Sequence, residues 1–511
     1  MLGEFPTMDG IKQAFVNFLE NNRGFVILFF CLPASFVRTW NDLPVQQRKT
    51  LCTARPNWLS LSTTFFDKTK CHQIPLDLHE ILHFDEQKME LWAEPNVTVR
   101  EAVKYLVPRG YTLKVCLEIG DATLGGLAFG VGMTTYSHKA GLYQETITEY
   151  EVVIANGEVI TVRADNEHAD LFYALPWSHG TLGFLVALRL QVVPAKPYVH
   201  MKYVPTNSKE EYCRELMRYS GALNKDQKVP DFLEATIFDE NRAVIMHGNF
   251  ADVDDWNKYF KVNDVCWWFK PWFYKHVESI HAGGAHEEFI PLESYLLRHN
   301  RAIFWVLESM IPFGNHPLFR LLFGWLCPPK PAFLKFTTTP LIREWTFAKQ
   351  VFQDIVLPLD TLAEQVDVAT KLFQRYPLLV YPCRIYDHKR GNQGQLRPPP
   401  KAKLVPGTNY AMFNDLGVYG TPGQVAKKQP YNPTTAMRDM EEFTRRVGGY
   451  SFLYADIFMT EDEFNQMFDL TLYNKVRKLY HCDGAFPTLY EKVRPEVDVI
   501  AIGNEYAKKT D

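Results

Sequence analysis

Residues Asp121–Gly141 read DATLGGLAFGVGMTTYSHKAG and carry five glycines, at positions 125, 126, 130, 132 and 141. Glycines at this density let backbone N–H groups approach a pyrophosphate or a flat ring closely, where any Cβ would collide. A glycine-rich turn in a β region is the alternative interpretation. A Rossmann fingerprint is excluded because GxGxxG and its strand–turn–helix frame are absent. The stretch therefore predicts a loop that binds a nucleotide or a ring.

Two further stretches support this interpretation. Trp177–Val186, WSHGTLGFLV, leads through two glycines into a strand, and Leu51–Leu59, LCTARPNWL, is a strand that breaks at Arg55-Pro56. Between them, Asn156-Gly157 joins two β-like runs and predicts a hairpin. Thr98–Leu106 reads as a helix with a Thr98–Glu101 capping box. Strands and helices mixed in this way predict an α+β fold rather than a regular βαβ wind.

The chain of 511 residues is long enough for two or three domains. We expect an N-terminal segment over 1–40, the glycine-bearing domain over 50–195, a substrate (cap) domain over 200–430 and a C-terminal helical segment over 434–495. Residues 200–375 are aromatic and richer in helical pattern. Residues 387–431 read as an exposed connector because of Pro398-Pro399-Pro400 and many Gly and Lys. Helical pattern resumes at 437–447 and 461–479.

Composition narrows the possible functions. The net charge is −4 and no long Lys/Arg run occurs, which argues against nucleic-acid binding. Aromatic residues reach 14% of the chain, which fits either a large core or a protein that holds an apolar ligand or sits on a membrane. The nine cysteines are odd in number and form no CxxC pair. We therefore expect neither a disulfide framework nor a metal site.

The N-terminus carries an amphipathic pattern over 11–19 and then thirteen uncharged residues, Phe25–Val37. A full span needs about 20 apolar residues, so a shallow, monotopic membrane anchor is expected, with a buried core segment as the alternative. Basic residues are slightly more frequent after this segment than before it, which points the body of the protein to the cytosol. Lys508-Lys509 near the C-terminus has the dilysine form used for retrieval to the endoplasmic reticulum.

The three stretches, in this order and spacing, resemble the FAD-binding domain of the vanillyl-alcohol-oxidase (PCMH-type) family. The resemblance extends to the delta-24-sterol reductase family through particular runs, listed here: CTARPNWLSLS, TLGG, SHKAGL, ADLFYALPWSHGTLGFLVA, WWFKPWFYKH, FIPLESY, RHNRAIFW, IPFGNHPLFRLLFGWLCPPK and AFP near residue 486. It implies a two-lobed FAD-binding domain with a cap domain, a noncovalent FAD, an NADPH donor, a sterol substrate and an endoplasmic-reticulum membrane site.

Carried over by position, the resemblance implies contacts with FAD from three loops. These residues are Arg55, Pro56 and Trp58 in the first loop, Thr123, Gly125, Gly126, Ser137, His138 and Gly141 in the second, and Gly180, Thr181 and Gly183 in the third. Some of the glycines can serve only the turn. The first loop has no histidine where related flavoproteins attach FAD covalently, which agrees with a dissociable flavin.

The sequence departs from this pattern in several places. Only residues 38–50 separate the apolar segment from LCTARP, where the family usually has a long helix and a strand. The first lobe is therefore either truncated or shortened by an incomplete gene model. Leu297 and Val306 replace a family His and a family Glu, and the segment 378–417 diverges strongly. Substrate identity depends on these positions.

The implied reaction is reduction of the isolated alkene at carbon 24 of a sterol side chain. No carbonyl stands ready to accept hydride, so the site must supply an acid, a dry pocket and aromatic faces that tolerate a developing cation. Candidate catalytic residues are Tyr419, Tyr454, His299 and Arg301. His299 and Arg301 can alternatively brace the polar edge of the flavin. Two other functions remain open: a flavin oxidase or dehydrogenase of the same fold, and a non-catalytic lipid-binding relative.

Overall fold

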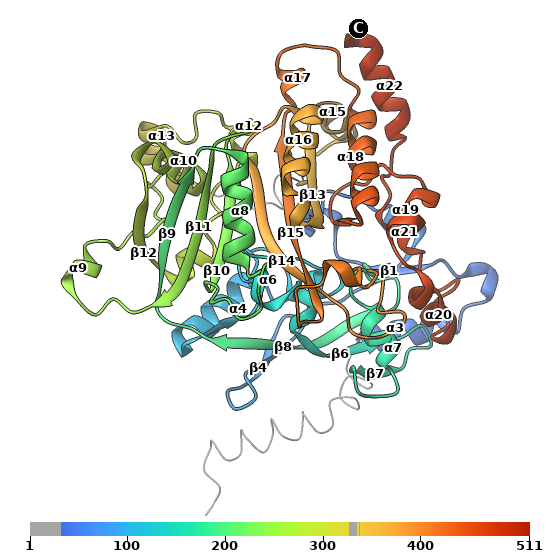
Figure 1. The fold of residues 1–511 in the computed structure, drawn as a ribbon. Coiled ribbons are helices and arrows are strands. Elements are labelled where there is room, and N and C mark those ends of the chain that lie inside the picture. Colours follow the sequence, from blue (N-terminus) through green and yellow to red (C-terminus); the bar gives the residue numbers. More distant parts are fainter. Residues whose placement is uncertain (1–31, 327–334, 337, 511) are drawn as a thin grey trace, which may run out of the picture.

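The structure is a computed structural model and describes residues 32–326, 335–336 and 338–510 (Figure 1). Residues 51–194, which we call the first domain, surround an antiparallel sheet in the order β3-β4-β8-β6-β7. The bounds are β3 (Ile81–Asp85), β4 (Glu90–Ala93), β6 (Ile147–Val153), β7 (Val159–Val162) and β8 (Phe184–Pro194). β5 (Tyr111–Leu113) pairs with β8, and β1 (Leu51–Thr53) pairs with β2 (His72–Ile74) in a small parallel sheet. Strands and helices alternate irregularly here, as expected for an α+β fold.

Local signals in this domain predicted its elements well. Helix α4 (Val99–Leu106) begins after Thr98, whose side chain and that of Glu101 form the expected capping box. β6 and β7 form the hairpin expected around Asn156-Gly157, with Val153 opposite Val159. β1 ends at Thr53, just before the predicted break at Arg55-Pro56. These three elements are confirmed.

A larger antiparallel sheet fills the second half of the molecule, in the order β12-β9-β11-β10-β14-β15-β13-β16. Its strands are β9 (Tyr198–Thr206), β10 (Phe232–Ile237), β11 (Ala243–Ala251), β12 (His286–Pro291), β13 (Val351–Pro358), β14 (Leu378–Tyr386), β15 (Tyr410–Gly420) and β16 (Tyr450–Ser451). Because β13 and β16 come from distant parts of the sequence, the sheet gathers residues that no local pattern connects.

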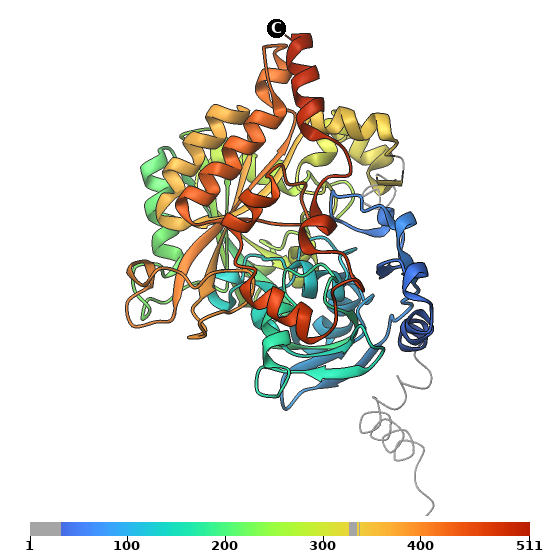
Figure 2. The ribbon, with the colours of Figure 1, turned by 90° about the vertical axis from the view of Figure 1, so that its right-hand side faces the viewer.

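The two faces of this sheet have different partners. Helices α8 (Lys209–Ser220), α16 (Leu362–Phe373) and α18 (Pro433–Val447) cover one face, as Figures 1 and 2 show. The opposite face packs into the core that contains the first domain and α10 (Phe273–Gly283), α11 (Leu292–Leu296) and α12 (Val306–Met310). Along β15, Leu416 and Val418 belong to the helical side, whereas Phe413 and Tyr419 belong to the side of the first domain. We call the latter side the inner face.

The expectation of an exposed connector over 387–431 is wrong for residues 410–420. β15 lies in this interval between β14 and β13, and all its residues are buried. A strand that is buried on both faces lacks the polar–apolar alternation that marks a half-exposed strand. Farther on, α18 confirms the helix expected at 437–447, and the pattern at 461–479 is two helices, α19 (Glu461–Met467) and α20 (Thr471–Leu479).

The expected amphipathic helix at 11–19 and most of the apolar run Phe25–Val37 lie outside the described residues. The described end of that run begins α3 (Leu32–Asn41), whose Ala34, Val37 and Trp40 are buried. Asn41 Nδ2 donates to Ala155 O at 2.9 Å, so α3 packs against the first domain. Among the helices described, none has both the length and the apolar character needed to cross a bilayer.

Candidate active site

Helix α5 (Leu124–Gly130) lies within the glycine-rich stretch 121–141. Thr123 caps the helix, its Oγ1 accepting from Gly126 N at 3.2 Å. A side chain at Gly125 would overlap Pro95, so this glycine is required by packing alone. Gly126 is exposed, and a Cβ there would meet only the capping hydroxyl of Thr123. Gly126 therefore offers open backbone, whereas Gly125 serves the fold.

Residues 134–141 attach this loop to the large sheet. In α6 (Ser137–Ala140), Ser137 Oγ accepts from Thr134 N at 3.0 Å. The two ring nitrogens of His138 lie 3.0 Å from Thr135 O and 2.9 Å from Pro230 O. Burial lowers the pKa of His138 to about 4 and keeps it neutral. Gly141 has φ +89°, and a Cβ there would collide with the ring of Tyr386 on β14. These residues join the first domain to the sheet.

The third stretch has an unusual backbone. Trp177, His179 and Gly180 have φ of 66°, 51° and 77°. Two of these are not glycine, so the loop holds strain of the kind that collects at ligand sites. Ser178 Oγ and His179 Nε2 are buried and have no hydrogen-bond partner among the described residues. Around Gly180 a Cβ would meet nothing within 4 Å. Buried polar atoms beside open backbone are what a flavin nucleotide requires.

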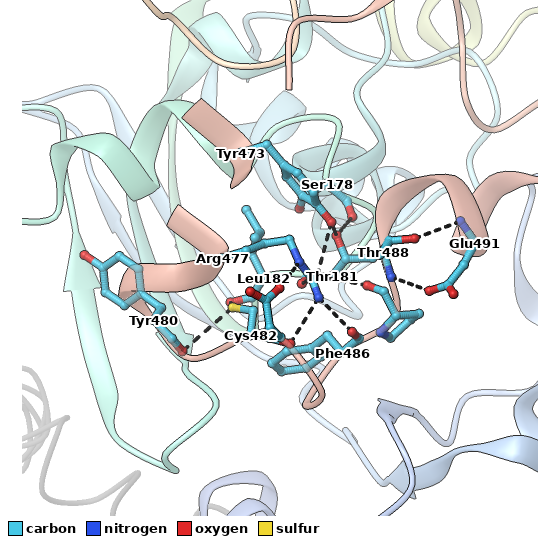
Figure 3. Close-up of polar contacts among 12 residues, drawn as sticks. Ser178, Thr181, Leu182, Tyr473, Arg477, Tyr480, Cys482, Phe486, Thr488 and Glu491 are labelled. Carbon is cyan, nitrogen blue, oxygen red and sulfur yellow. Dashed lines mark hydrogen bonds and ion pairs between the residues drawn. The ribbon is translucent and has the colours of Figure 1, made fainter. Parts of the chain in front are cut away.

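The C-terminal segment holds this loop in place (Figure 3). Thr181 Oγ1 lies 2.7 Å from Tyr473 OH on α20. Arg477, also on α20, donates to Thr181 O at 3.0 Å. The same guanidinium donates to three further carbonyls, those of Cys482, Phe486 and Pro487, at 3.0 to 3.1 Å. Arg477 thereby connects the 178–182 loop to the turn before α21 (Leu489–Val493). No local sequence pattern predicted this contact.

The first loop joins the second through Pro95 and Asn96. Arg55 Nη1 donates to Asn96 Oδ1 at 3.1 Å, and Gly125 N donates to Pro95 O at 2.9 Å. His179 N donates to Phe129 O at 3.2 Å and links the second loop to the third. Gly183 packs on β6, where a Cβ would overlap Val152. Pro56 and Trp58 of the first loop lie at the surface, Trp58 against Phe336. The three loops thus lie together.

Two carboxyls and two phenols meet on the inner face of the large sheet. They belong to Asp354, Asp415, Tyr419 and Tyr454, and we call them the acid cluster. Tyr419 OH on β15 donates to Asp354 Oδ1 on β13. Burial raises the pKa of Asp354 to about 6, although its contacts with Tyr419 and Tyr454 act in the opposite direction. Burial, together with repulsion from Asp354, raises the pKa of Asp415 well above its usual range. Asp415 Oδ1 has no partner in the described structure. The pair of carboxyls therefore retains a proton near neutral pH.

The register of the sheet explains why these groups meet. Asp354 is paired with Gly417, and Tyr381 with Asp415, across neighbouring strands. Any side chain at Gly417 would collide with the hydroxyl of Tyr419. A glycine at this position thus leaves the space in which Tyr419 reaches Asp354.

A buried ionic network lies beside the acid cluster. Arg298 Nε donates to Glu234 on β10 at 2.8 Å, and its Nη2 donates to Glu118 and to Tyr381 OH, both at 3.3 Å. Burial opposes ionisation of Glu234, but Arg298 and His299 outweigh it and lower its pKa to about 2. Burial raises the pKa of Glu118, which precedes the glycine stretch. One arginine thus connects the first domain to two strands of the large sheet.

His299 and Arg301 occupy different surroundings. His299 Nε2 lies 3.4 Å from Glu234 Oε2, and its ring stacks on Phe304 at 4.6 Å. Phe304 in turn lies 5.6 Å from the Tyr419 ring, so His299 borders the acid cluster. Arg301 donates instead to backbone carbonyls of residues 265–271, including Trp268 O at 2.8 Å. The structure brings Tyr419, Tyr454 and His299 into one region and places Arg301 under an aromatic loop.

Comparisons with known proteins give the family of this chain. The family model described as an FAD binding domain matches residues 46–163. A Delta(24)-sterol reductase homolog of Caenorhabditis elegans is 38% identical, over 89% of this chain and 85% of its own length. The Delta(24)-sterol reductase of Homo sapiens is 36% identical over 89% and 84%, and that of Pisum sativum 31% identical over 96% and 94%. The chain belongs to the Delta(24)-sterol reductase family.

Proposed function

We propose that this chain reduces the carbon-24 double bond of a sterol side chain, with FAD as a dissociable cofactor and NADPH as the electron donor. The observation that carries the proposal is the Asp354–Tyr419 pair. It is a buried acid on the inner face of the large sheet, the face that packs against the first domain. Reduction of an isolated alkene needs such an acid. Family membership supplies the substrate class.

The three loops have the features that FAD requires. Gly126 and Gly180 leave open backbone, and Ser178 and His179 present buried polar atoms that lack a partner among the described residues. When bound, FAD would supply the hydride that adds to the alkene. Arg477 holds the 178–182 loop from behind and acts as a positioning residue.

The remaining chemistry falls to side chains of the protein. The tertiary carbon 25 carries positive charge better than carbon 24, so the proton is expected at carbon 24. Tyr419 OH can deliver a proton only when Asp354 is itself protonated, because an ionised Asp354 holds the phenolic proton. Phe304 and Trp305, with ring centroids 5.6 and 5.4 Å from Tyr419, offer aromatic faces to the developing charge.

We further propose that the protein works at the endoplasmic-reticulum membrane with its catalytic domain in the cytosol. The dilysine form at Lys508-Lys509 and the slight basic excess after the apolar run support this placement. NADPH supply on the cytosolic side requires the same orientation. Protease added to intact microsomes should digest the catalytic domain, and a protected domain would put it in the lumen.

A direct assay tests the reaction. Purified full-length protein is incubated with NADPH and with desmosterol, zymosterol or a 24-methylene sterol, and the products are read by mass spectrometry. We expect a gain of two hydrogens on at least one sterol and a flavin that acid precipitation releases into the supernatant. Oxidation of alcohols with peroxide release would identify a flavin oxidase instead. Absence of both flavin and turnover would identify a non-catalytic lipid-binding relative.

A further inference from the structure

Three basic residues lie together where the first loop meets α21. Lys68 Nζ donates to Thr53 O at 2.8 Å and to Arg55 O, so it contacts the backbone of the first loop. Lys492 on α21 is close enough to Lys68 for the two ammonium groups to repel each other. We call Arg55, Lys68 and Lys492 the cationic cluster.

The cationic cluster has no carboxylate counterpart. In the part of the chain that the structure describes, no Asp or Glu pairs with any of its three members. Among the same residues Lys492 Nζ has no hydrogen-bond acceptor, and it lies 3.9 Å from the centroid of the Phe66 ring. Arg55 Nε is buried and also lacks a partner there. Buried cations are normally paired, so this cluster has the character of a site for an anion.

His179 of the third loop lies beside the same cluster. Its Nε2 is buried and has no partner within the described structure. Burial and the charge of Lys492 lower the pKa of His179 to about 3, so the ring is neutral and carries one N–H that it can donate. Next to it, Gly180 leaves open backbone. Three separate segments of the chain thus place donors and positive charge around one position.

The pKa of Lys492 reflects the missing anion. Burial and repulsion from Lys68 lower this pKa to about 8, and the thiols of Cys52 and Cys71 act in the opposite direction without outweighing them. An anion bound beside the ammonium would raise the pKa again. At a pH above 8, binding of an anion should therefore be accompanied by uptake of a proton by Lys492.

We propose that the cationic cluster and His179 bind the diphosphate of FAD. The proposal rests on the proposed function, because it takes FAD as the ligand. The flavin ring and the adenine are uncharged at neutral pH, so the diphosphate is the part of FAD that a group of cations selects.

The origin of Lys492 gives the proposal a structural consequence. Lys492 belongs to α21, and Arg477 connects the turn before α21 to the third loop through Pro487 O and Thr181 O. The diphosphate site is therefore complete only when the C-terminal segment is docked on the first domain. The glycine-rich stretches alone do not reveal this contribution.

The test uses full-length protein from which flavin has been removed, titrated with FAD by fluorescence. Lys492→Met should weaken FAD binding about 10- to 100-fold, because a hydrogen bond to a charged group is lost. Lys492→Arg keeps the charge and should bind FAD nearly as tightly as the wild type. The matched control is Lys209→Met on α8, since the side chain of Lys209 is 15% exposed and pairs with Glu240 at 3.2 Å far from the loops. That variant should bind FAD like the wild type.

Competition by fragments of the cofactor locates the contact. ADP, which carries the diphosphate, should lose affinity for Lys492→Met by a factor similar to that for FAD. Adenosine, which has no phosphate, should compete equally well in the variant and in the wild type.

Proton uptake provides a readout that requires no substitution. Calorimetry of FAD binding to the wild type above pH 8, in two buffers of different ionisation enthalpy, should show uptake of part of a proton. FAD affinity should also fall as pH rises through about 8. Lys492→Arg stays charged and should show neither effect. Cys71→Ser should still show both, because the pKa of Cys71, about 6, lies below this range.

Three results would contradict the proposal. Wild-type affinity of Lys492→Met for FAD and ADP, without proton uptake in the wild type, would mean that the cluster does not contact the diphosphate. Equal losses of FAD and adenosine affinity would make Lys492 a residue of the fold. A higher KM for NADPH with unchanged FAD affinity would assign the cluster to the electron donor. Wild-type protein that binds no FAD would instead contradict the proposed function, and ADP binding would still report on the cluster.

Discussion

Asp354 occupies a position in which a carboxyl can hold a proton close to neutral pH. Its surroundings remove water, which favours the neutral acid, while the phenols of Tyr419 and Tyr454 favour the carboxylate. Asp415, with a pKa raised still further by burial and by Asp354, is neutral over the same range. Two carboxyls that share limited solvation in this way commonly divide acid and base roles between them.

Replacing the acid without changing its shape tests this role. We expect Asp354→Asn to lower kcat about 100-fold, the contribution typical of a general acid, while flavin absorbance of the purified protein stays unchanged. Stopped-flow measurement of NADPH-dependent flavin reduction should be normal, because that step needs no proton from Asp354. Loss of flavin reduction together with turnover would place Asp354 in cofactor binding instead.

The pKa of Asp354 also predicts how stability depends on pH. Its pKa is raised from an unfolded value of 3.8 to about 6 in the folded protein. The stability it contributes is therefore fully present below pH 3.8 and is lost as pH rises through about 6. Between pH 5 and pH 8 the Tm of the Asp354→Asn variant should fall less than that of the wild type. Parallel curves would mean that Asp354 titrates at its ordinary pKa.

At the scale of elements, Tyr473 and Arg477 of α20 hold the 178–182 loop, and the guanidinium of Arg477 also reaches the turn before α21. Arg477 is buried and donates to four backbone carbonyls, a pattern that a planar, multiply donating group can satisfy and a lysine ammonium cannot. We expect Arg477→Lys to lower the free energy of unfolding by about 2–4 kcal/mol, because buried carbonyls lose their donors. FAD titration should show at least tenfold weaker retention.

The matched control is Arg446→Lys on α18. Arg446 is 60% exposed at its side chain and pairs with Glu364 at the surface. Exposed pairs contribute little, so urea denaturation should show a change within about 0.5 kcal/mol. If Arg477→Lys weakens folding but leaves FAD affinity unchanged, the arginine serves the fold alone.

Elements also show what the sequence could and could not predict. The α4 capping box and the hairpin after β6 are local signals, written within a few residues, and both were predictable. β15 was missed because all its positions are buried, which removes the alternation that identifies a strand. Asp354 and Arg477 had no local signal. Their roles depend on strand register and on contacts across nearly 300 residues of chain.

At the scale of the whole molecule, Arg298 joins the two halves. Glu118 comes from the first domain, and Glu234 and Tyr381 come from β10 and β14 of the large sheet. All these groups are fully buried, so each charge depends on the others for compensation. Removing one partner from such a network lowers the free energy of unfolding by far more than the intact network raises it relative to apolar side chains.

Arg298→Met therefore gives a prediction with a definite sign. The free energy of unfolding of the variant should be about 3–5 kcal/mol lower than that of the wild type at pH 8, because Glu118 and Glu234 become uncompensated buried charges. In the wild type the low pKa of Glu234, about 2, contributes stability that is present above pH 4.5 and is lost as pH falls through about 2. Without the guanidinium, burial should instead raise the pKa of Glu234 above 4.5, so that acidification neutralises it. The difference in Tm between wild type and variant should then narrow from pH 8 to pH 5. A difference that stays constant over this range would show that the two glutamates are neutral without Arg298, and that the junction between the two halves is held by packing.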